Sequence, residues 1–370
     1  MKIMKNFLIP FHGLSFHMCK SSYKGMKPTF LIYQITERCN SRCKMCGIWK
    51  KKVEKELTIQ EINSIFKNEF FSSLRWINIT GGEPFLRREL VDAVLVFKEN
   101  CSKLEAISIP TNGFLTDKIL STINEILDIL SDKIFLSLTV SIDGIGKKHD
   151  EIRGVENGFE KAISTLKALK EIKKNNFEFG VETIVFDENI DGIEETYLFL
   201  RNYTQHINIT PVIESNFFEG GAKPTRKNFE KLLQFLRKIE NENLSYAYYY
   251  RKLEEIFLSE RKYPCLAGYK TLYIDSKGYL YPCHLLGSEF SMGNLCNDDI
   301  KNLWFSENAR NIRKKLENNS YCKTCTNNCD IINNLKEEGI DFLSFLAKNP
   351  KIFFSLVEQI KEGKMRAYVG

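Results

Sequence analysis

The stretch ERCNSRCKMCGIWK, residues 37–50, places three cysteines within eight positions: Cys39, Cys43 and Cys46. Structural zinc takes four cysteine or histidine ligands, usually as two close pairs. The spacing here is not two pairs, and the nearest upstream histidine, His17, is more than twenty residues away. An iron–sulfur cube is also held by thiolates, and three of them leave one iron open for a small chelating molecule. The triplet therefore predicts an iron–sulfur cluster with an open iron.

Alternating strand and helix patterns run from residue 30 to residue 213. Short β-branched and aromatic runs predict strands, and helical periodicity between them predicts helices. The predicted strands are 30–36, 74–80, 106–112, 135–143, 177–186 and 207–213, and the predicted helices are 59–70, 87–99, 117–130, 159–174 and 190–202. Such repeats form parallel sheets with right-handed crossovers. Because six strands fall short of the eight of a complete barrel, we expect an α/β fold, an open partial (β/α)6 TIM-like barrel.

Four unusual segments coincide with strand ends. The cysteine triplet follows the first strand, GGEP (81–84) the second and TNG (111–113) the third, while SIDG (141–144) ends the fourth. In such barrels ligands lie at the C-terminal ends of the strands. We therefore expect these segments to gather on one rim.

The segment CNSRCKMC (39–46) resembles the CxxxCxΦC signature of the radical S-adenosylmethionine (radical SAM) superfamily, with Met45 at the Φ position. GGEP resembles the second motif of that superfamily, whose usual core is a partial (β/α)6 barrel. The resemblance covers roughly residues 28–215. It implies that the three cysteines hold a [4Fe-4S] cluster and that the amino and carboxylate groups of S-adenosylmethionine (SAM) chelate its open iron.

The resemblance also implies contacts with SAM, one of them from Met45. Gly81 and Gly82 lack side chains, so the main chain can approach the methionine end closely. Glu83 can accept hydrogen bonds from the ammonium group. Ser141 and Asp143 are placed to meet the methionine carboxylate and the ribose.

Two further candidates leave alternatives open. Arg153 is expected to pair with the carboxylate of SAM, or else to form a surface salt bridge. Asn112 is expected either to face the ribose or to serve as a helix cap or turn residue. The implied reaction is reductive cleavage of SAM to a 5′-deoxyadenosyl radical that takes hydrogen from the substrate. A reducing partner such as flavodoxin or ferredoxin would supply the electron.

A second cysteine group occupies residues 263–335. TLYIDSKGYLYPC (271–283) predicts a hairpin with its turn at Ser276–Gly278. The group resembles the SPASM and twitch extensions of the superfamily but has fewer cysteines than a full SPASM domain. The resemblance implies one auxiliary [4Fe-4S] cluster used in electron transfer, and zinc is the alternative. The implied ligands are Cys265, Cys283, Cys322 and Cys325, and Cys329 either replaces one of them or is a free thiol.

The remaining segments are predicted to be an N-terminal extension (1–27), a helical linker (216–262) and a helical tail (336–370). Two apolar stripes in the tail are split by Pro350 and surrounded by lysines. Docking on the open side of the barrel, contact with a protein partner and peripheral contact with a membrane surface all fit this pattern.

Composition narrows the class of protein. The 370 residues carry a net charge of +6, and Lys and Glu are intermixed without an arginine stripe interleaved with aromatics, so nucleic acid is not an expected partner. No apolar run approaches the roughly 18 residues of a membrane span. The N-terminal apolar stretch is too short for a secretory signal. We therefore expect a cytoplasmic location.

The combined expectation is a radical SAM enzyme with one auxiliary cluster and an unidentified substrate. Because only about 27 residues precede the first strand, no separate peptide-recognition domain is expected. A small-molecule or lipid-like substrate is therefore slightly favoured over a peptide or protein. The alternatives from other classes are a non-catalytic iron–sulfur electron carrier and a zinc-bearing RNA-binding protein.

Overall fold

The computed structural model describes residues 25–215, 224–240, 244–261 and 265–328, together with Ile331, Ala347, Pro350 and Phe354. Most of the extension 1–27, nearly all of the tail 336–370 and Cys329 lie outside these ranges. The predictions made for them stay predictions.

One mixed sheet organises the described chain, with strand order β6-β5-β4-β3-β2-β1-β7-β8-β9. Its first six strands are parallel to their neighbours. They are β1 (Phe30–Thr36), β2 (Trp76–Gly81), β3 (Ala106–Thr111), β4 (Phe135–Ser141), β5 (Phe177–Val185) and β6 (Ile207–Pro211). Because β6 lies at an edge of this sheet, the barrel is open, and the predicted partial (β/α)6 architecture is confirmed.

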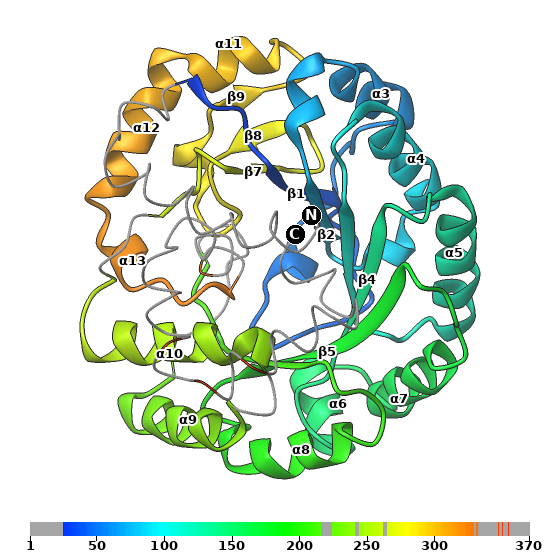
Figure 1. Cartoon of the computed structure of the whole chain (residues 1–370), viewed down its shortest axis with the longest axis vertical. Helices are drawn as coiled ribbons and strands as arrows, with labels where there is room; N and C mark the ends of the chain where they lie inside the picture. Colours follow the sequence, from blue (N-terminus) through cyan, green and yellow to red (C-terminus); the bar gives the residue numbers. More distant parts are fainter. Residues whose placement is uncertain are drawn as a thin grey trace.

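Helices cover the outer side of the curved sheet (Figure 1). They are α3 (Ile59–Phe66), α4 (Leu90–Asn100), α5 (Thr116–Ile129), α6 (Lys147–Arg153), α7 (Gly158–Leu169) and α8 (Ile193–Leu200), with short 3-10 turns η2 (Ile48–Lys50), η3 (Glu69–Ser73), η4 (Pro84–Leu86) and η5 (Ile190–Gly192). A capping box of Thr58 and Glu61 opens α3. The sequence patterns did not predict α6.

The main core lies between β-strands and this helical layer. On β1, Tyr33 points outward, and its ring centroid is 6.0 Å from that of Phe66 on α3 and 5.4 Å from that of Phe97 on α4. Edge-on aromatic contacts of this kind add to the stabilisation from burial. They fix which face of β1 meets the helices, and so which face lines the inside of the curve.

The predicted linker forms α9 (Arg226–Ile239) and α10 (Leu244–Leu258). On α10, Tyr249, Tyr250 and Leu253 are buried. These three residues recur at helical spacing and form a buried face of α10.

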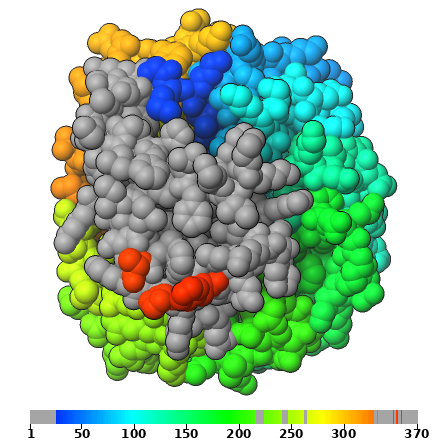
Figure 2. Space-filling view, viewed as in Figure 1, coloured from blue at the N-terminus to red at the C-terminus, as the bar shows by residue number. Residues whose placement is uncertain are grey.

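The second cysteine region begins with the predicted hairpin, made of β7 (Thr271–Ile274) and β8 (Tyr279–Tyr281), and continues through η6 (Ser288–Phe290), β9 (Gly293–Asn294), α11 (Ile300–Phe305), α12 (Glu307–Glu317) and α13 (Ser320–Lys323). β7 pairs in parallel with β1 from Phe30↔Thr271 to Tyr33↔Ile274. The hairpin therefore extends the sheet of the barrel. In the space-filling view, the described elements form a rim that runs from blue and cyan through green to yellow and orange (Figure 2).

Within the described ranges, no helix is both long enough and apolar enough to cross a membrane.

Candidate active site

The loop that carries the cysteine triplet connects β1 to η2. Cys43 is buried, and Cys39 and Cys46 are partly buried. Ser41 lies between two of the thiols: its main-chain N–H donates to Cys39 Sγ at 3.4 Å, and its hydroxyl lies 3.1 Å from Cys43 Sγ. Hydrogen bonds to sulfur are one means by which a protein tunes an iron–sulfur site.

The loop is anchored to α6, the helix that the sequence did not predict. The main-chain N–H groups of Arg42 and Lys44 donate to the carbonyls of Arg153 (2.8 Å) and Ile152 (2.9 Å). The Ser41 hydroxyl donates to the same Arg153 carbonyl at 2.9 Å. The last turn of α6 therefore fixes the backbone between the first and third cysteines.

The donor set fits an iron–sulfur cluster. Burial raises the pKa of Cys39 to about 12 and also raises the pKa of Cys46. Such thiols keep their protons until a cation displaces them, so binding of the cluster would release protons. No three His, Cys, Asp or Glu side chains in the described ranges gather closely enough to hold one metal ion. The thiolates of an iron–sulfur cluster surround a core of several iron and sulfide ions. They can therefore lie farther apart than the ligands of a single metal ion.

The glycines of GGEP allow β2 to approach the cysteine loop. A Cβ at Gly81 would lie 2.4 Å from the Thr36 carbonyl oxygen, and one at Gly82 would lie 2.1 Å from the Arg38 carbonyl oxygen. The N–H of Gly82 donates to Thr36 and that of Glu83 donates to Arg38, both at 2.8 Å. The predicted role was close approach to SAM. In the structure the space at both Cβ positions is taken by protein backbone.

Glu83 is buried and accepts three hydrogen bonds, from Thr111 Oγ1 (2.9 Å), the Asn112 N–H (2.8 Å) and the Phe85 N–H (3.2 Å). Burial nevertheless raises its pKa to about 7. Its carboxylate joins the ends of β2 and β3. The predicted contact with the SAM ammonium group would add a cation to a carboxylate that already has these donors.

Asn112 serves as a turn residue. Its Oδ1 accepts from the Phe114 N–H at 3.0 Å, and its Nδ2 donates to Asn40 Oδ1 at 2.7 Å. Asn40 belongs to the cysteine loop, so Asn112 also ties the end of β3 to that loop.

Asp143 and Arg153 form a buried ion pair with Nε and Oδ2 2.6 Å apart. The alternative that Arg153 makes a surface salt bridge is therefore wrong. Burial alone would lower the pKa of Arg153, but the Asp143 carboxylate raises it above its ordinary value. Arg153 Nη1 also donates to Cys43 Sγ at 3.7 Å, which places a cation beside the triplet.

This ion pair keeps hydrogen-bonding capacity for a ligand. Within the described part of the chain, neither Arg153 Nε nor Asp143 Oδ2 has a hydrogen bond of good geometry, although the two atoms are in contact. Buried polar atoms are normally paired. A carboxylate for Arg153 and a hydroxyl for Asp143 would complete them, and SAM supplies both groups. Ser141 and Met45, the other predicted SAM contacts, are partly buried.

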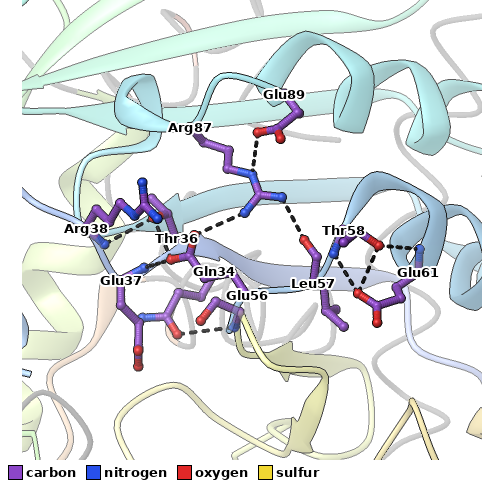
Figure 3. A network of polar contacts seen from close by, with 11 residues as sticks. Gln34, Thr36, Glu37, Arg38, Glu56, Leu57, Thr58, Glu61, Arg87 and Glu89 are labelled. Carbon is purple, nitrogen blue, oxygen red and sulfur yellow. Dashed lines mark hydrogen bonds and ion pairs between the residues drawn. The ribbon is translucent and has the colours of Figure 1, made fainter. Parts of the chain in front are cut away.

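A polar network holds the start of the cysteine loop (Figure 3). Glu56 Oε1 accepts from the Thr36 hydroxyl at 2.7 Å and from the Glu37 N–H at 2.8 Å. Arg87, three residues after GGEP, donates to Glu56 Oε2 at 3.0 Å and to the Leu57 carbonyl at 2.7 Å. The sequence patterns gave no sign of this pairing between residues about thirty positions apart.

The inner face of the sheet is polar toward the C-terminal ends of its strands. Ladder partners share a face of a sheet, and Gln34 faces inward because Tyr33 faces the helices. The inward-facing polar residues are Gln34, Asn78, Thr80, Ser108, Ser137, Thr139, Ser141, Glu178, Glu182, Asn208 and Thr210. On β2 and β4, helix-facing residues are buried while inward-facing ones are partly exposed. On the other strands Gln34, Ser108, Asn208 and Thr210 are buried. The partly exposed polar positions of the inner face are therefore those of β2 and β4, together with Glu178 and Glu182 on β5.

Glu182 is the acidic residue in this inner face nearest to the candidate SAM contacts, because it pairs with Ser141 in the ladder. Its Oε1 accepts from Thr210 Oγ1 at 2.6 Å and from Asn328 Nδ2 at 3.5 Å. Burial raises its pKa to about 7, and the charge of Asp143 contributes to the rise.

Four cysteines of the second group come together. Cys283 and Cys325 are buried in one small apolar cluster, and Cys265 and Cys322 pack against it. The N–H of Leu285 donates to Cys283 Sγ at 3.4 Å. The four residues are those predicted as auxiliary ligands, and the assignment of all four as ligands stays a prediction.

Comparisons with known proteins agree with this geometry. Residues 33–200 match the radical SAM superfamily, and residues 265–330 match the SPASM iron–sulfur cluster-binding domain. The antilisterial bacteriocin subtilosin biosynthesis protein AlbA of Bacillus subtilis is 24% identical over 323 residues, covering 80% of this chain and 67% of AlbA. A probable GTP 3′,8-cyclase of Archaeoglobus fulgidus is 33% identical over 216 residues, covering 56% of this chain and 66% of that protein.

The fold also matches solved structures. Streptococcus suis SuiB bound to its precursor peptide SuiA aligns with a TM-score of 0.59 and 17% identity, covering 84% of this chain and 74% of SuiB. At that identity the likeness concerns the fold. The domain matches identify the family. The cysteine triplet, GGEP and the buried ion pair, which lie together on one rim, agree with it. The chain belongs to the radical SAM superfamily and is an enzyme with a C-terminal SPASM-type iron–sulfur domain.

Proposed function

We propose that this enzyme oxidises a C–H bond of a polar substrate held inside the curve of the sheet. When bound, the cluster and SAM supply a 5′-deoxyadenosyl radical that removes the hydrogen atom. The chain contributes the three thiolates of Cys39, Cys43 and Cys46 and a binding site for SAM. The observation that carries the proposal is the set of partly exposed polar side chains that β2 and β4 present inside the curve.

The roles of the surrounding residues follow from their contacts. Arg153 binds the carboxylate of SAM and stays charged because Asp143 is beside it. Asp143 accepts a hydrogen bond from the ribose. Glu83 holds the ends of β2 and β3 in place and presents its charge toward the SAM ammonium group. In each role a charged side chain forms a hydrogen bond with a group of SAM, and such charge-assisted hydrogen bonds are the strong ones.

The polar inner wall argues against a lipid-like substrate. An apolar chain would cover partly exposed inward-facing groups such as Thr139 and Ser141 without offering them hydrogen bonds of its own, and such burial is costly. A peptide or a nucleotide-sized molecule offers donors and acceptors along its length. AlbA is named for the biosynthesis of a bacteriocin, the SuiB structure holds a precursor peptide, and each protein aligns with at least 80% of this chain. We propose a peptide as the leading substrate class.

A small polar molecule is the second candidate. The probable GTP 3′,8-cyclase of Archaeoglobus fulgidus is 33% identical to the present core, and that protein is named for a nucleotide substrate. A small molecule was also favoured from the sequence. The inner wall accommodates either class, so the experiment must separate them.

We further propose that the second cysteine group holds one auxiliary [4Fe-4S] cluster. Cys265, Cys283, Cys322 and Cys325 come together in one apolar cluster and would close all four ligand positions. A closed cluster has no site for a substrate, which favours a role in electron transfer. It would take the electron that remains when the substrate radical is oxidised.

Iron and sulfide content after anaerobic reconstitution test the cluster assignments. We expect about eight irons per chain, at four irons per cube, falling to about four in Cys39→Ala/Cys43→Ala/Cys46→Ala. That variant should also lose dithionite-driven formation of 5′-deoxyadenosine. Cys296→Ala, at an exposed cysteine, is the matched control and should change neither result. Zinc in place of iron, or full clusters without SAM cleavage, would contradict the proposal.

The substrate class is tested with deuterium. Peptide and small-metabolite fractions from cells grown in deuterated medium would be incubated separately with the reconstituted enzyme and SAM. Deuterium in 5′-deoxyadenosine identifies the fraction that donates the hydrogen atom. Labelling by the peptide fraction alone supports the leading class, and labelling by the metabolite fraction alone supports the second.

A further inference from the structure

Glu182 is an acid at a position where its hydrogen bonds do not require one. Its Oε1 accepts from Thr210 Oγ1 at 2.6 Å and from Asn328 Nδ2 at 3.5 Å, and both partners are uncharged. A glutamine would accept the same two hydrogen bonds through its amide oxygen. Because burial raises the pKa of Glu182 to about 7, ionising this carboxyl opposes folding, whereas a glutamine would carry no such cost. An acid that lowers stability inside an open barrel is a candidate functional group.

The backbone places Glu182 beside the candidate SAM contacts. It pairs with Ser141 in the ladder, and two residues further along β5 the N–H of Ile184 donates to Asp143 Oδ1 at 2.9 Å. Glu182 is partly exposed on the inner face, while the residues on either side of it are buried. A substrate held inside the curve can therefore touch this carboxyl close to the place where the 5′-deoxyadenosyl radical forms.

One hydrogen-bond partner of Glu182 belongs to the C-terminal iron–sulfur domain. Asn328 lies three residues after Cys325, which is one of the proposed auxiliary ligands. The same segment is fixed to the barrel side, because the Tyr249 hydroxyl on α10 donates to the Thr326 carbonyl at 2.9 Å. Glu182 therefore lies next to the segment that would hold an electron acceptor.

Three other acids near this part of the inner face already have partners. Glu83 accepts three hydrogen bonds, and Asp143 belongs to the buried ion pair. Glu178 is paired with His206 at 3.2 Å and precedes Glu182 by four residues, which is roughly 13 Å along a strand. Of the four acids, Glu182 alone combines uncharged hydrogen-bond partners with a place beside the SAM contacts.

We propose that Glu182 accepts the proton that the substrate loses when its radical is oxidised, while the auxiliary cluster accepts the electron. The inference rests on the proposed function, which supplies the radical. C5′ of the 5′-deoxyadenosyl radical first forms a bond with the hydrogen atom that leaves the substrate carbon. An O–H, N–H or S–H bond of the substrate then breaks heterolytically. Its proton goes to the Glu182 carboxylate, its electron pair forms the new bond to that carbon, and the unpaired electron of the carbon goes to the auxiliary cluster.

Among the described residues, the titratable groups that face Glu182 from neighbouring elements are Asp143 at the end of β4, Arg153 on α6 and Tyr250 on α10. Beyond the effect of burial, the charge of Asp143 raises the pKa of Glu182 and the charge of Arg153 lowers it. Burial and the charge of Glu182 raise the pKa of Tyr250, so that phenol stays neutral. Glu182 can therefore accept and release a proton near neutral pH, as a general base must.

A single-turnover experiment separates removal of the hydrogen atom from loss of the proton. The variants are Glu182→Gln, which keeps the hydrogen bonds, and Glu182→Asp, which keeps a carboxylate. The control is Glu105→Gln, at a nearly half-exposed acid paired with Arg75. The full reconstituted chains would be reduced with titanium(III) citrate, freed of excess reductant and mixed with SAM. The probe is the deuterated peptide fraction or, where only that fraction labels 5′-deoxyadenosine, the deuterated metabolite fraction.

Two readouts follow each turnover: deuterium in 5′-deoxyadenosine, and electron paramagnetic resonance of the reduced clusters and of any organic radical. All four proteins should transfer deuterium within about twofold of one another. In the wild type and the control, the cluster signal should return as the substrate radical is oxidised. This step should become faster as the pH rises through about 7, because only the ionised carboxylate accepts a proton.

In Glu182→Gln the return of the cluster signal should be slower by at least about 100-fold, an organic radical should accumulate, and the pH dependence should disappear. Glu182→Asp should recover part of the rate. A glutamine variant that oxidises the substrate radical at the wild-type rate, or with the wild-type pH profile, would overturn the proposal. Loss of deuterium transfer in that variant would also overturn it, because Glu182 would then act in binding. If the wild type takes deuterium from neither fraction, the proposed function itself fails and this inference fails with it.

Discussion

Removing Arg87 should damage the cluster site from a distance. Its guanidinium joins Glu56, Glu89 and the carbonyl of Leu57 (Figure 3). The side chains of Arg87 and Glu56 are only 11% and 6% exposed. Arg87→Met keeps most of the apolar contacts and removes the charge. Glu56 is then left as a buried carboxylate without its cation.

An uncompensated buried charge of this kind costs about 3–5 kcal/mol. Many domains are stable by only about 5–15 kcal/mol, so the loss should be large in urea denaturation. Glu56→Gln/Arg87→Met removes both charges and keeps an amide oxygen for the donors on Thr36 and Glu37. Replacing both partners of a buried pair is often close to neutral. The double variant should therefore recover most of the stability.

The matched control is Arg75→Met. Arg75 pairs with Glu105 at 2.7 Å, but both side chains are nearly half exposed, and such pairs contribute about 0–1 kcal/mol. A loss below about 1 kcal/mol for Arg87→Met, or a double variant no more stable than the single one, would refute the argument. Iron analysis adds a second measurement. Because Glu56 holds the N–H of Glu37, Arg87→Met should lose the cluster of the triplet before the auxiliary one.

Three other perturbations have definite expected results. Gly82→Ala places a Cβ 2.1 Å from a carbonyl oxygen of the cysteine loop, so it should halve the iron content and abolish SAM binding, measured by equilibrium dialysis. Arg153→Met should destabilise the fold by about 3–5 kcal/mol, whereas Asp143→Asn/Arg153→Met should regain stability in urea without regaining SAM cleavage. Burial raises the pKa of Glu182 from 4.5 to about 7, so its ionisation opposes folding increasingly as pH rises between those values. Glu182→Gln should therefore gain stability over wild type from pH 5 to pH 8 in urea denaturation.

Each of these has a control or a contrary outcome. A Cβ added at Gly192 would have no described atom within 4 Å, and the residue has an ordinary negative φ, so Gly192→Ala should load both clusters. A double variant at Asp143 and Arg153 with normal SAM cleavage would exclude both residues from the SAM site. A stability difference for Glu182→Gln that does not change with pH would show that this carboxyl is not the group that titrates.

The sequence predicted the strands well because each has a strong local signal. FLIYQIT (30–36) is β1 without a shift, and the end of β4 falls at Ser141 inside the predicted 135–143. The triplet and GGEP could be placed on one rim because parallel strands end at a common edge. Those predictions needed only local patterns and chain order.

The missed features depend on contacts between distant residues. The sequence of α6, KKHDEIR, has a single aliphatic residue, and the helix is held by Arg153 and Ile152, whose carbonyls bind the cysteine loop. Glu182 alternates with buried residues on β5 as a solvent-facing residue would. A period of two cannot distinguish an outer surface from the accessible inside of an open barrel.

The pairing of β7 with β1 also depends on contacts between distant residues, and it leads to a last prediction. Residues more than 200 positions apart give no local signal of pairing, so the sequence predicts the hairpin but not its place in the sheet of the barrel. In the structure Leu57 N–H donates to the Ser276 carbonyl at 2.8 Å, and Lys277 contacts Glu37 at 3.7 Å. The hairpin thus braces both β1 and the start of the cysteine loop.

A chain ending at residue 262 should therefore fail to hold the cluster of the triplet. Without β7, the main-chain groups of β1 from Phe30 to Tyr33 lose their partners, and an exposed strand edge promotes aggregation. The full-length variant Cys265→Ala/Cys283→Ala/Cys322→Ala/Cys325→Ala keeps the hairpin and should retain about four irons, at four irons per cube. If the truncated chain is monodisperse, holds four irons and binds SAM like the full-length variant, the bracing argument is wrong. In that case, removing the hairpin would have the same effect as removing only the four auxiliary cysteines. The hairpin would then matter only for the auxiliary cluster.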